Sequence, residues 1–174
     1  GDWSSDVCSS DLEIYYFGRD FRRHRESILE QVNFSSTYTN LPWELTVQEN
    51  LNYLSLLYDI PDRKGRVEKI IGLFDLSGLV KKKMHQLSSG QLTRVNLAKA
   101  FLNFPKVLLL DEPTASLDPD VAKYIRKFLL EERERFNVSI ILTSHNMAEV
   151  EETCDRVVFI RRGKIVAEDR KSVV

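Results

Sequence analysis

Apolar and polar positions in the first half of the chain predict two short strands followed by a helical section. Residues 13–17 are rich in β-favouring aromatics and end at a glycine, and residues 31–36 form another short strand pattern. Thr46 and Glu49 have the spacing of a capping box, and leucines then recur at helical spacing. Asp62 precedes a second helix with apolar residues at i, i+3, i+4 and i+7. Two amphipathic helices packed on a core account for this section.

The second half of the chain alternates between helical and strand patterns. A helix after Asp118 has Pro119 in its first turn, which is typical of a helix start, and an apolar stripe of Val121, Ile125, Phe128 and Leu129. Apolar, β-branched strands that alternate with helices predict an α/β fold with a buried, mainly parallel sheet. The predicted helices cover 90–102, 146–153 and the segment after Asp118, and the predicted strands cover 106–110, 138–143, 156–160 and 164–167.

Composition and charge narrow the class of protein. The 174 residues suit one domain or a large part of one, and 43% hydrophobic residues exclude a disordered chain. Lys and Arg number 25 and Asp and Glu 26, so a net charge of −1 argues against a nucleic-acid partner. The longest apolar runs, such as 107–110 and 157–160, are far shorter than the ~20 residues of a membrane-spanning helix, so we expect no transmembrane helix in this sequence.

Two adjacent carboxylates follow one of the most apolar predicted strands. Asp111 and Glu112 come directly after Val107–Leu110, at the end of a strand where open α/β sheets bind ligands. Neighbouring carboxylates repel each other and a polyphosphate unless a divalent cation is present. We therefore predict that Asp111 holds Mg²⁺ and that Glu112 orients or deprotonates an attacking water. A polar exit from a strand into a loop accounts equally well for these two residues taken alone.

A second candidate site precedes the helix predicted over 90–102. The segment Leu87–Gln91 contains Ser88, Ser89 and Gly90, whose small size lets backbone amides approach a ligand. A helix N-terminus also presents unpaired N–H groups and the positive end of the helix dipole, so this segment is suited to a phosphate. A serine N-cap without any ligand is the simpler interpretation if the segment is considered in isolation.

Two further polar segments follow or join the predicted strands. His145 lies just past the strand predicted over 138–143, beside Asp111 and Glu112 if the two strands are neighbours. There it would donate a hydrogen bond to a terminal phosphate and to the attacking water, although a single histidine at a strand end is more often an ordinary polar residue. The segment 115–118 is by itself a turn with an N-cap.

Taken together and in this order, these motifs resemble those of the ATP-binding-cassette (ABC) ATPase family. Leu87–Gln91 is similar to the family signature LSGGQ, with Ser89 in place of a glycine, and Val107–Asp111 resembles the Walker B strand. The resemblance covers about 13–168 and implies a P-loop NTPase-like core, with a mainly parallel sheet and a helical subdomain at about 46–86. It implies these roles: Glu112 (catalytic glutamate) and His145 (switch histidine), Asp111 (metal), and Ser88, Ser89, Gly90, Gln91, Ser116 and Asp118 (nucleotide contacts).

The phosphate-binding Walker A loop of that family, G-x-x-x-x-G-K-(S/T), does not occur in these 174 residues. The Gly163–Lys164 pair is followed by isoleucine, and no two glycines have the required spacing. We therefore expect a fragment that lacks the first strands and the Walker A helix. We interpret 1–12 as a non-native or disordered segment, 13–168 as a partial ABC ATPase domain and 169–174 as a tail. The family's Q-loop position falls near residues 35–37, without an assigned residue.

The resemblance implies that the parent protein is the ATP-binding and ATP-hydrolysing subunit of an ABC transporter, with ATP and Mg²⁺ as ligands. Its expected partners are a membrane permease and a second ATPase subunit paired head to tail, at the cytoplasmic face of the membrane. Without Walker A, the fragment alone should be inactive. A non-catalytic partner-binding module and a soluble ABC ATPase of translation or DNA repair are the alternatives. The cargo, the direction of transport and the pairing of the parent subunit stay open.

Overall fold

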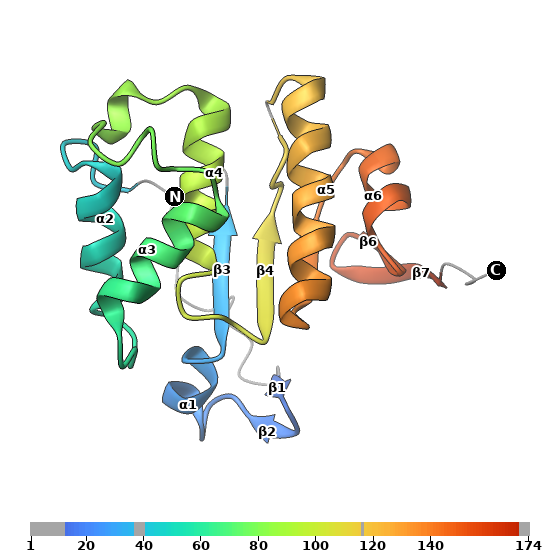
Figure 1. Cartoon of the computed structure of the whole chain (residues 1–174). Coiled ribbons are helices and arrows are strands. Elements are labelled where there is room, and N and C mark those ends of the chain that lie inside the picture. The colour runs from blue at the N-terminus through green and yellow to red at the C-terminus, as the bar shows by residue number, and fades with distance from the viewer. Residues whose placement is uncertain (1–12, 37–40, 116, 171–174) are drawn as a thin grey trace, which may run out of the picture.

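A three-stranded parallel sheet forms the centre of the chain in the computed structural model, which describes residues 13–36, 41–115 and 117–170 (Figure 1). The sheet has the order β3–β4–β5, from β3 (Val32–Ser36), β4 (Val107–Asp111) and β5 (Ser139–Thr143). Its register aligns Ser36, Asp111 and Thr143 at the carboxyl edge. The expected α/β fold with a parallel central sheet is confirmed.

Helices pack against this sheet and share one hydrophobic core with it. Helix α4 (Ser89–Ala100) packs along β3, and α5 (Pro119–Phe136) lies beside β4 (Figure 1). Helix α2 (Val47–Ser55) contacts both α3 (Arg63–Leu73) and α4. Phe74 of α3's C-terminal cap meets Phe101 and Phe128, with ring centroids 5.5 Å and 4.7 Å away, so the helical section is joined to the rest by buried aromatics. The described residues also form α1 (Arg25–Leu29), α6 (Met147–Thr153) and a short 3-10 helix over Met84–Gln86.

Local capping explains where several helices begin. The Thr46 hydroxyl accepts the amide of Glu49 while the Glu49 carboxylate accepts the amide of Thr46, which is the expected capping box. Asp62 caps α3 by accepting the amide of Gly65. Asp118 differs from expectation, because it precedes α5 without a side-chain cap bond and the helix starts on Pro119.

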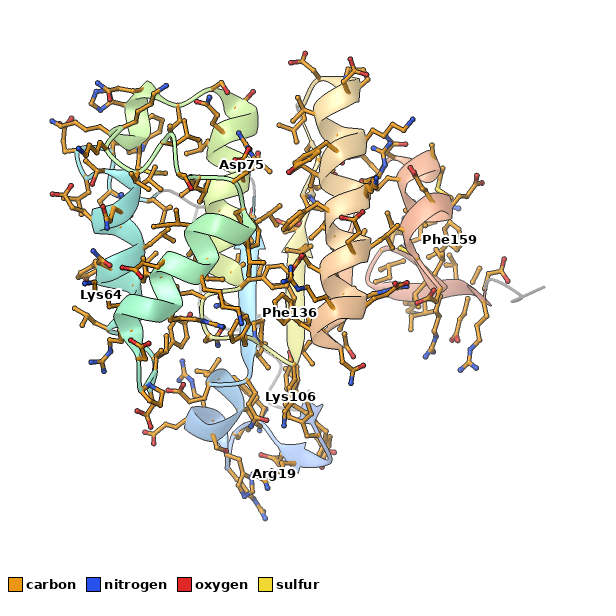
Figure 2. The ribbon with its side chains drawn as sticks, in the orientation of Figure 1. Arg19, Lys64, Asp75, Lys106, Phe136 and Phe159 are labelled. Carbon is orange, nitrogen blue, oxygen red and sulfur yellow. The ribbon has the colours of Figure 1, made fainter. Side chains whose placement is uncertain are left out.

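The strand expected over residues 13–17 was predicted too long. Only Tyr15–Tyr16 (β1) is extended, and it pairs antiparallel with Arg19–Asp20 (β2). Phe17 and Gly18 have φ values of 54° and 72°, so the glycine ends the strand in a tight hairpin turn. Of the arginines that follow, Arg19 lies on this hairpin, Arg22 and Arg23 lie in the turn after it, and Arg25 begins α1. Figure 2 shows Arg19 at the end of the molecule away from the carboxyl edge of the sheet.

The two closing strands form a separate antiparallel hairpin of β6 (Arg156–Arg161) and β7 (Lys164–Arg170), on which Figure 2 labels Phe159. Strand β7 extends two residues beyond 168, the predicted end of the domain. Apolar side chains on this hairpin are exposed, with Ile160 at 70% and Ile165 at 67%. No helix in the described part of the chain is both long enough and apolar enough to span a membrane.

Candidate functional site

Asp111 is held at the carboxyl edge of the sheet by hydroxyl groups from both neighbouring strands. Thr143 Oγ1 donates to Asp111 Oδ1 at 2.7 Å, and Ser36 Oγ donates to Asp111 Oδ2 at 3.2 Å. All three residues share one register position, so their side chains project from the same face of the sheet. The two hydrogen bonds orient the carboxylate, and each of its oxygens retains a lone pair for a further ligand.

Glu112 leaves the sheet in an unusual backbone conformation. Its φ is 50°, in the left-handed region that residues other than glycine rarely adopt. The Glu112 amide donates to the Thr143 carbonyl and to Thr143 Oγ1, both at 3.2 Å, and these bonds help to hold the conformation. Such backbone strain is concentrated at functional sites. Here it turns the chain abruptly after Asp111.

His145 contacts Glu112 directly, as the position of the two residues after adjacent parallel strands predicted. His145 Nδ1 donates to Glu112 Oε1 at 2.9 Å. The His145 side chain is 80% exposed and the Glu112 side chain 27% exposed. The hydrogen bond to Glu112 and the negative charge of that carboxylate raise the pKa of His145. A protonated His145 keeps its second N–H, on Nε2, for another acceptor.

A buried carboxylate lies directly behind this pair. Glu149 of α6 is 2% exposed, and it accepts hydrogen bonds from Thr114 Oγ1 at 2.7 Å and from Ser144 Oγ at 2.5 Å. Asn146 caps α6, since its side chain accepts the amides of Ala148 and Glu149. The loops that carry Glu112 and His145 are therefore both tied to the start of α6.

Four of the six candidate nucleotide-contact residues, Ser88, Ser89, Gly90 and Gln91, lie at the start of α4. Ser88 and Gln91 form a capping box, with the Gln91 amide donating to Ser88 Oγ and the Ser88 amide to Gln91 Oε1. Gly90 packs so closely on α5 that a Cβ there would lie 2.9 Å from Val121 Cγ1. Ser89 is the first residue of α4 and Asp118 precedes α5, whereas Ser116 lies outside the described residues.

The edge around Asp111 fits a magnesium ion that a substrate helps to hold. No group of three or more His, Cys, Asp or Glu side chains converges as a metal site in the residues that the structure describes. Mg²⁺ needs no such cage, because it is usually bound by one or two carboxylates together with phosphate oxygens and waters. Asp111, with its hydroxyl neighbours Ser36 and Thr143, supplies a hard oxygen set of that kind.

Comparison with known proteins identifies the family. A family model described as "ABC transporter" matches residues 10–115, which is more than half of the chain. The chain belongs to the ABC transporter family. Among its curated relatives in that family is methionine import ATP-binding protein MetN 2 of Oceanobacillus iheyensis, 40% identical over 131 residues, which are 74% of this chain and 38% of the relative. MetN of Geobacillus kaustophilus is 36% identical over 151 residues, 86% of this chain and 43% of that protein.

Solved ABC structures agree with this fold. The structure of cbiO1 from Clostridium perfringens, described as part of the ABC transporter complex cbiONQ, matches with a TM-score of 0.82 and 26% identity over 92% of this chain and 66% of its own. An ATP-binding cassette in a dimeric post-hydrolysis state, bound to ADP and Pi, matches with a TM-score of 0.77 at 22% identity and supports the fold alone. The chain spans less than half the length of the curated ABC relatives named above.

Sequence reasoning assigned no role to three residues that shape this edge of the sheet, namely Ser36, Thr143 and Glu149, although Ser36 falls in the range expected for the Q-loop. Ser36 and Thr143 end their strands in register with Asp111, so a search for hydroxyls at the ends of neighbouring strands would have found them. Glu149 is four residues after His145 on a short helix, and no pattern distinguishes it from the exposed acidic residues around it. Only its burial reveals it.

Proposed function

We propose that this chain is part of the ATP-binding and ATP-hydrolysing subunit of an ABC transporter. The contact that carries the proposal is the 2.9 Å hydrogen bond between His145 and Glu112, beside the anchored Asp111 at the carboxyl edge of a parallel sheet. A carboxylate and an imidazole placed together at such an edge suit proton transfer next to a phosphoryl group. Membership of the ABC family makes ATP the expected substrate.

In this proposal each side chain of the edge has one role. Glu112 accepts a proton from the attacking water, and His145 orients Glu112 through Nδ1 while donating through Nε2 to the terminal phosphate. Asp111 holds Mg²⁺. When bound, that ion neutralises charge on the phosphate oxygens. The exposed side of the Glu112–His145 pair leaves room for a triphosphate to approach.

The residues at the start of α4 act, in the same proposal, on the nucleotide of a second subunit paired head to tail. Ser88, Ser89, Gly90 and Gln91 stand at the positive end of a twelve-residue helix, where backbone N–H groups favour a phosphate. Ser116 and Asp118 come between β4 and α5 in the sequence, and in this proposal they complete the set of residues that act on the second subunit's nucleotide.

The decisive variant is Glu112→Gln in a longer form of the protein that includes a Walker A loop. The amide keeps the size of the side chain but does not accept a proton from water. We expect ATP binding to persist in a filter or fluorescence assay, while steady-state phosphate release is lost. Unchanged hydrolysis would refute the assignment of Glu112 as the base.

Glu131→Gln provides a matched control for that variant. Glu131 is on α5, its side chain is 61% exposed, and it forms an exposed i,i+4 pair with Lys127. Such a pair contributes little to stability, about 0.3–0.5 kcal/mol. We expect the control to hydrolyse ATP like the unmodified protein, so that a loss confined to Glu112→Gln reports on chemistry rather than on net charge.

The helical section provides the proposed contact with a membrane permease at the cytoplasmic face. Several large apolar side chains on and around α2 are exposed, among them Trp43, Tyr53, Leu56 and Leu57 at 51–63%. Exposed apolar groups gathered on one section suit a protein partner. Replacing Leu56 and Leu57 together by serine should abolish co-purification with the permease, whereas Leu29→Ser on α1 should preserve it. Equal recovery of the permease in both would count against this surface.

The relatives also favour a direction of transport. The curated relatives described above are named as methionine import ATP-binding proteins. We therefore propose that the parent protein serves an importer. Uptake of labelled methionine by cells with and without the gene would test both the direction of transport and the cargo. Methionine uptake that does not depend on the gene would exclude methionine as the cargo.

A further inference from the structure

A buried carboxylate connects the two loops that carry the proposed catalytic pair. Thr114 follows Glu112 by two residues, Ser144 directly precedes His145, and both hydroxyls donate to Glu149. Thr114 is 8% exposed and Glu149 2% exposed, so little solvent competes for these bonds. The two oxygens of Glu149 are used separately, Oε1 for the β4 loop and Oε2 for the β5 loop.

The short hydrogen bonds to Glu149 make this connection stiff. A buried carboxylate without partners is costly, and hydrogen bonds to a charged acceptor are stronger than those between neutral groups. Ser144 Oγ also accepts the amide of Asn146 at 3.1 Å, so its hydroxyl is fixed as a donor to Glu149 and as an acceptor. Asn146 in turn caps α6 and holds the amides of Ala148 and Glu149.

His145, by contrast, has little packing of its own. Its side chain is 80% exposed, and its bond to Glu112 depends on where the backbone places it. The residues on either side of it, Ser144 and Asn146, are both bound to the start of α6. On the other loop, Glu112 adopts a left-handed backbone conformation. This loop is held by the hydrogen bond from the Glu112 amide to the Thr143 carbonyl and by the hydrogen bond from the Thr114 hydroxyl to Glu149.

We propose that Glu149 is a positioning residue that holds the His145 loop against the Glu112 loop and so sets the contact between these two side chains. The effect of this positioning on ATP hydrolysis rests on the proposed function, whereas its effect on the contact between His145 and Glu112 does not. Without Glu149 accepting from both loops, Thr114 and Ser144 would lose their common partner, and His145 would no longer be held over Glu112.

The first test changes the hydroxyl donors and leaves every charge in place. In the 174-residue chain, Thr114→Val removes one donor and Thr114→Ser restores it; Ser144→Ala and Ser144→Thr form the same pair on the other loop. The readout is the titration of the His145 imidazole by NMR. We expect the His145 pKa to fall in Thr114→Val and Ser144→Ala, toward its value in Glu112→Gln, and to recover in Thr114→Ser and Ser144→Thr.

A purely structural role for Glu149 gives a different result. The two donor-removing variants would then unfold at lower denaturant concentration, but the His145 pKa would match that of the unmodified chain. That outcome in either folded variant overturns the proposal. Two variants on different loops are used so that poor folding of one leaves the other to decide.

A second test uses a longer protein with ATPase activity and concerns the consequence for hydrolysis. Thr114→Val should lower kcat by on the order of tenfold with little change in the KM for ATP, since misplacement of a catalytic pair affects the chemical step. Thr114→Ser should recover it. If the longer protein hydrolyses no ATP at all, the proposed function fails, while the NMR result on His145 still decides the role of Glu149.

Discussion

Among single residues, the contact between Glu112 and His145 has the clearest electrostatic consequence. Glu112 accepts the Nδ1 hydrogen bond of His145, and this bond and the carboxylate charge raise the pKa of the imidazole. The charged pair is therefore fully formed below the ordinary pKa of histidine and is lost as the pH rises through the raised pKa in the folded chain. Because His145 is so exposed, this contact bears on protonation far more than on stability.

Replacing Glu112 by glutamine should lower the pKa of His145. The variant removes the negative charge that favours the imidazolium, although an amide oxygen still accepts a hydrogen bond. NMR titration of the imidazole in the 174-residue chain measures the change directly, and Glu131→Gln serves as the control for overall charge. A His145 pKa that does not respond to Glu112→Gln would mean that the two side chains are apart in solution.

The pair itself was predictable from sequence, whereas its surroundings were not. Glu112 and His145 each follow an apolar strand, and the carboxyl ends of parallel strands meet at one edge, so strand order alone brings them together. Glu149 is buried and accepts hydrogen bonds from Thr114 and Ser144, which are 35 and 5 residues away in the chain. Sequence spacing carries no information about such contacts.

Among the elements, the start of α4 combines a structural cap with a proposed ligand site. Variants of Ser88 distinguish these two roles. Ser88→Ala removes the side-chain bond to the Gln91 amide and should lower the free energy of unfolding by about 1 kcal/mol, as measured by urea denaturation. Ser88→Asp should retain that cap in the 174-residue chain. In a longer protein it should nevertheless reduce ATP turnover, because it brings negative charge to a phosphate. Full turnover in Ser88→Asp would leave Ser88 as a cap alone.

Arg66 of α3 joins the helical section to the end of α4. The Arg66 side chain is buried and donates to the carbonyls of Phe101 and Leu102, and its guanidinium lies over the Phe104 ring. Arg66→Met should lower the free energy of unfolding by about 2 kcal/mol in urea denaturation, because the carbonyls lose a charged donor. Arg66→Lys should restore only part, since an ammonium lacks the planar fork.

The exposed Arg63 on the same helix provides the control for Arg66. We expect Arg63→Met to change the free energy of unfolding by less than about 0.5 kcal/mol. If both variants unfold alike, the buried bonds of Arg66 to Phe101 and Leu102 contribute nothing specific.

Element boundaries were predictable where a local signal sets them and failed where pairing sets them. Thr46 and Asp62 cap their helices through side chains three residues away from the amides they bind, so the sequence contains the whole interaction. The strand predicted over 13–17 was wrong in length, because Gly18 folds the chain back and β1 pairs only with Arg19–Asp20. Gly18 marked the end of the strand, but the aromatic content of 13–17 did not show that only Tyr15 and Tyr16 would be paired.

In the molecule as a whole, the central sheet is covered unequally on its two faces. Leu108 and Leu110 of β4 are buried on one face, whereas Phe34 and Ile141, in register on the other, are 46% and 60% exposed. Parallel sheets are normally covered on both faces. The polar edge formed by Ser36, Asp111 and Thr143 belongs to this open face. A phosphate bound at Asp111 would thus have a carboxylate and hydroxyls on the protein side, but no amide-lined loop from the described residues.

The 174-residue chain by itself should therefore neither bind ATP tightly nor hydrolyse it. The printed sequence contains no G-x-x-x-x-G-K-(S/T) loop, and the Glu112–His145 pair does not replace the backbone amides and lysine that such a loop presents to phosphates. Calorimetric titration with ATP and Mg²⁺, and phosphate release at saturating ATP, measure both properties. Trace hydrolysis that persists in Glu112→Gln would come from a contaminant. Robust hydrolysis that Glu112→Gln abolishes would show that the phosphates are held by residues of this chain other than a Walker A loop, and the open sheet face beside Asp111 would be the first place to look for them.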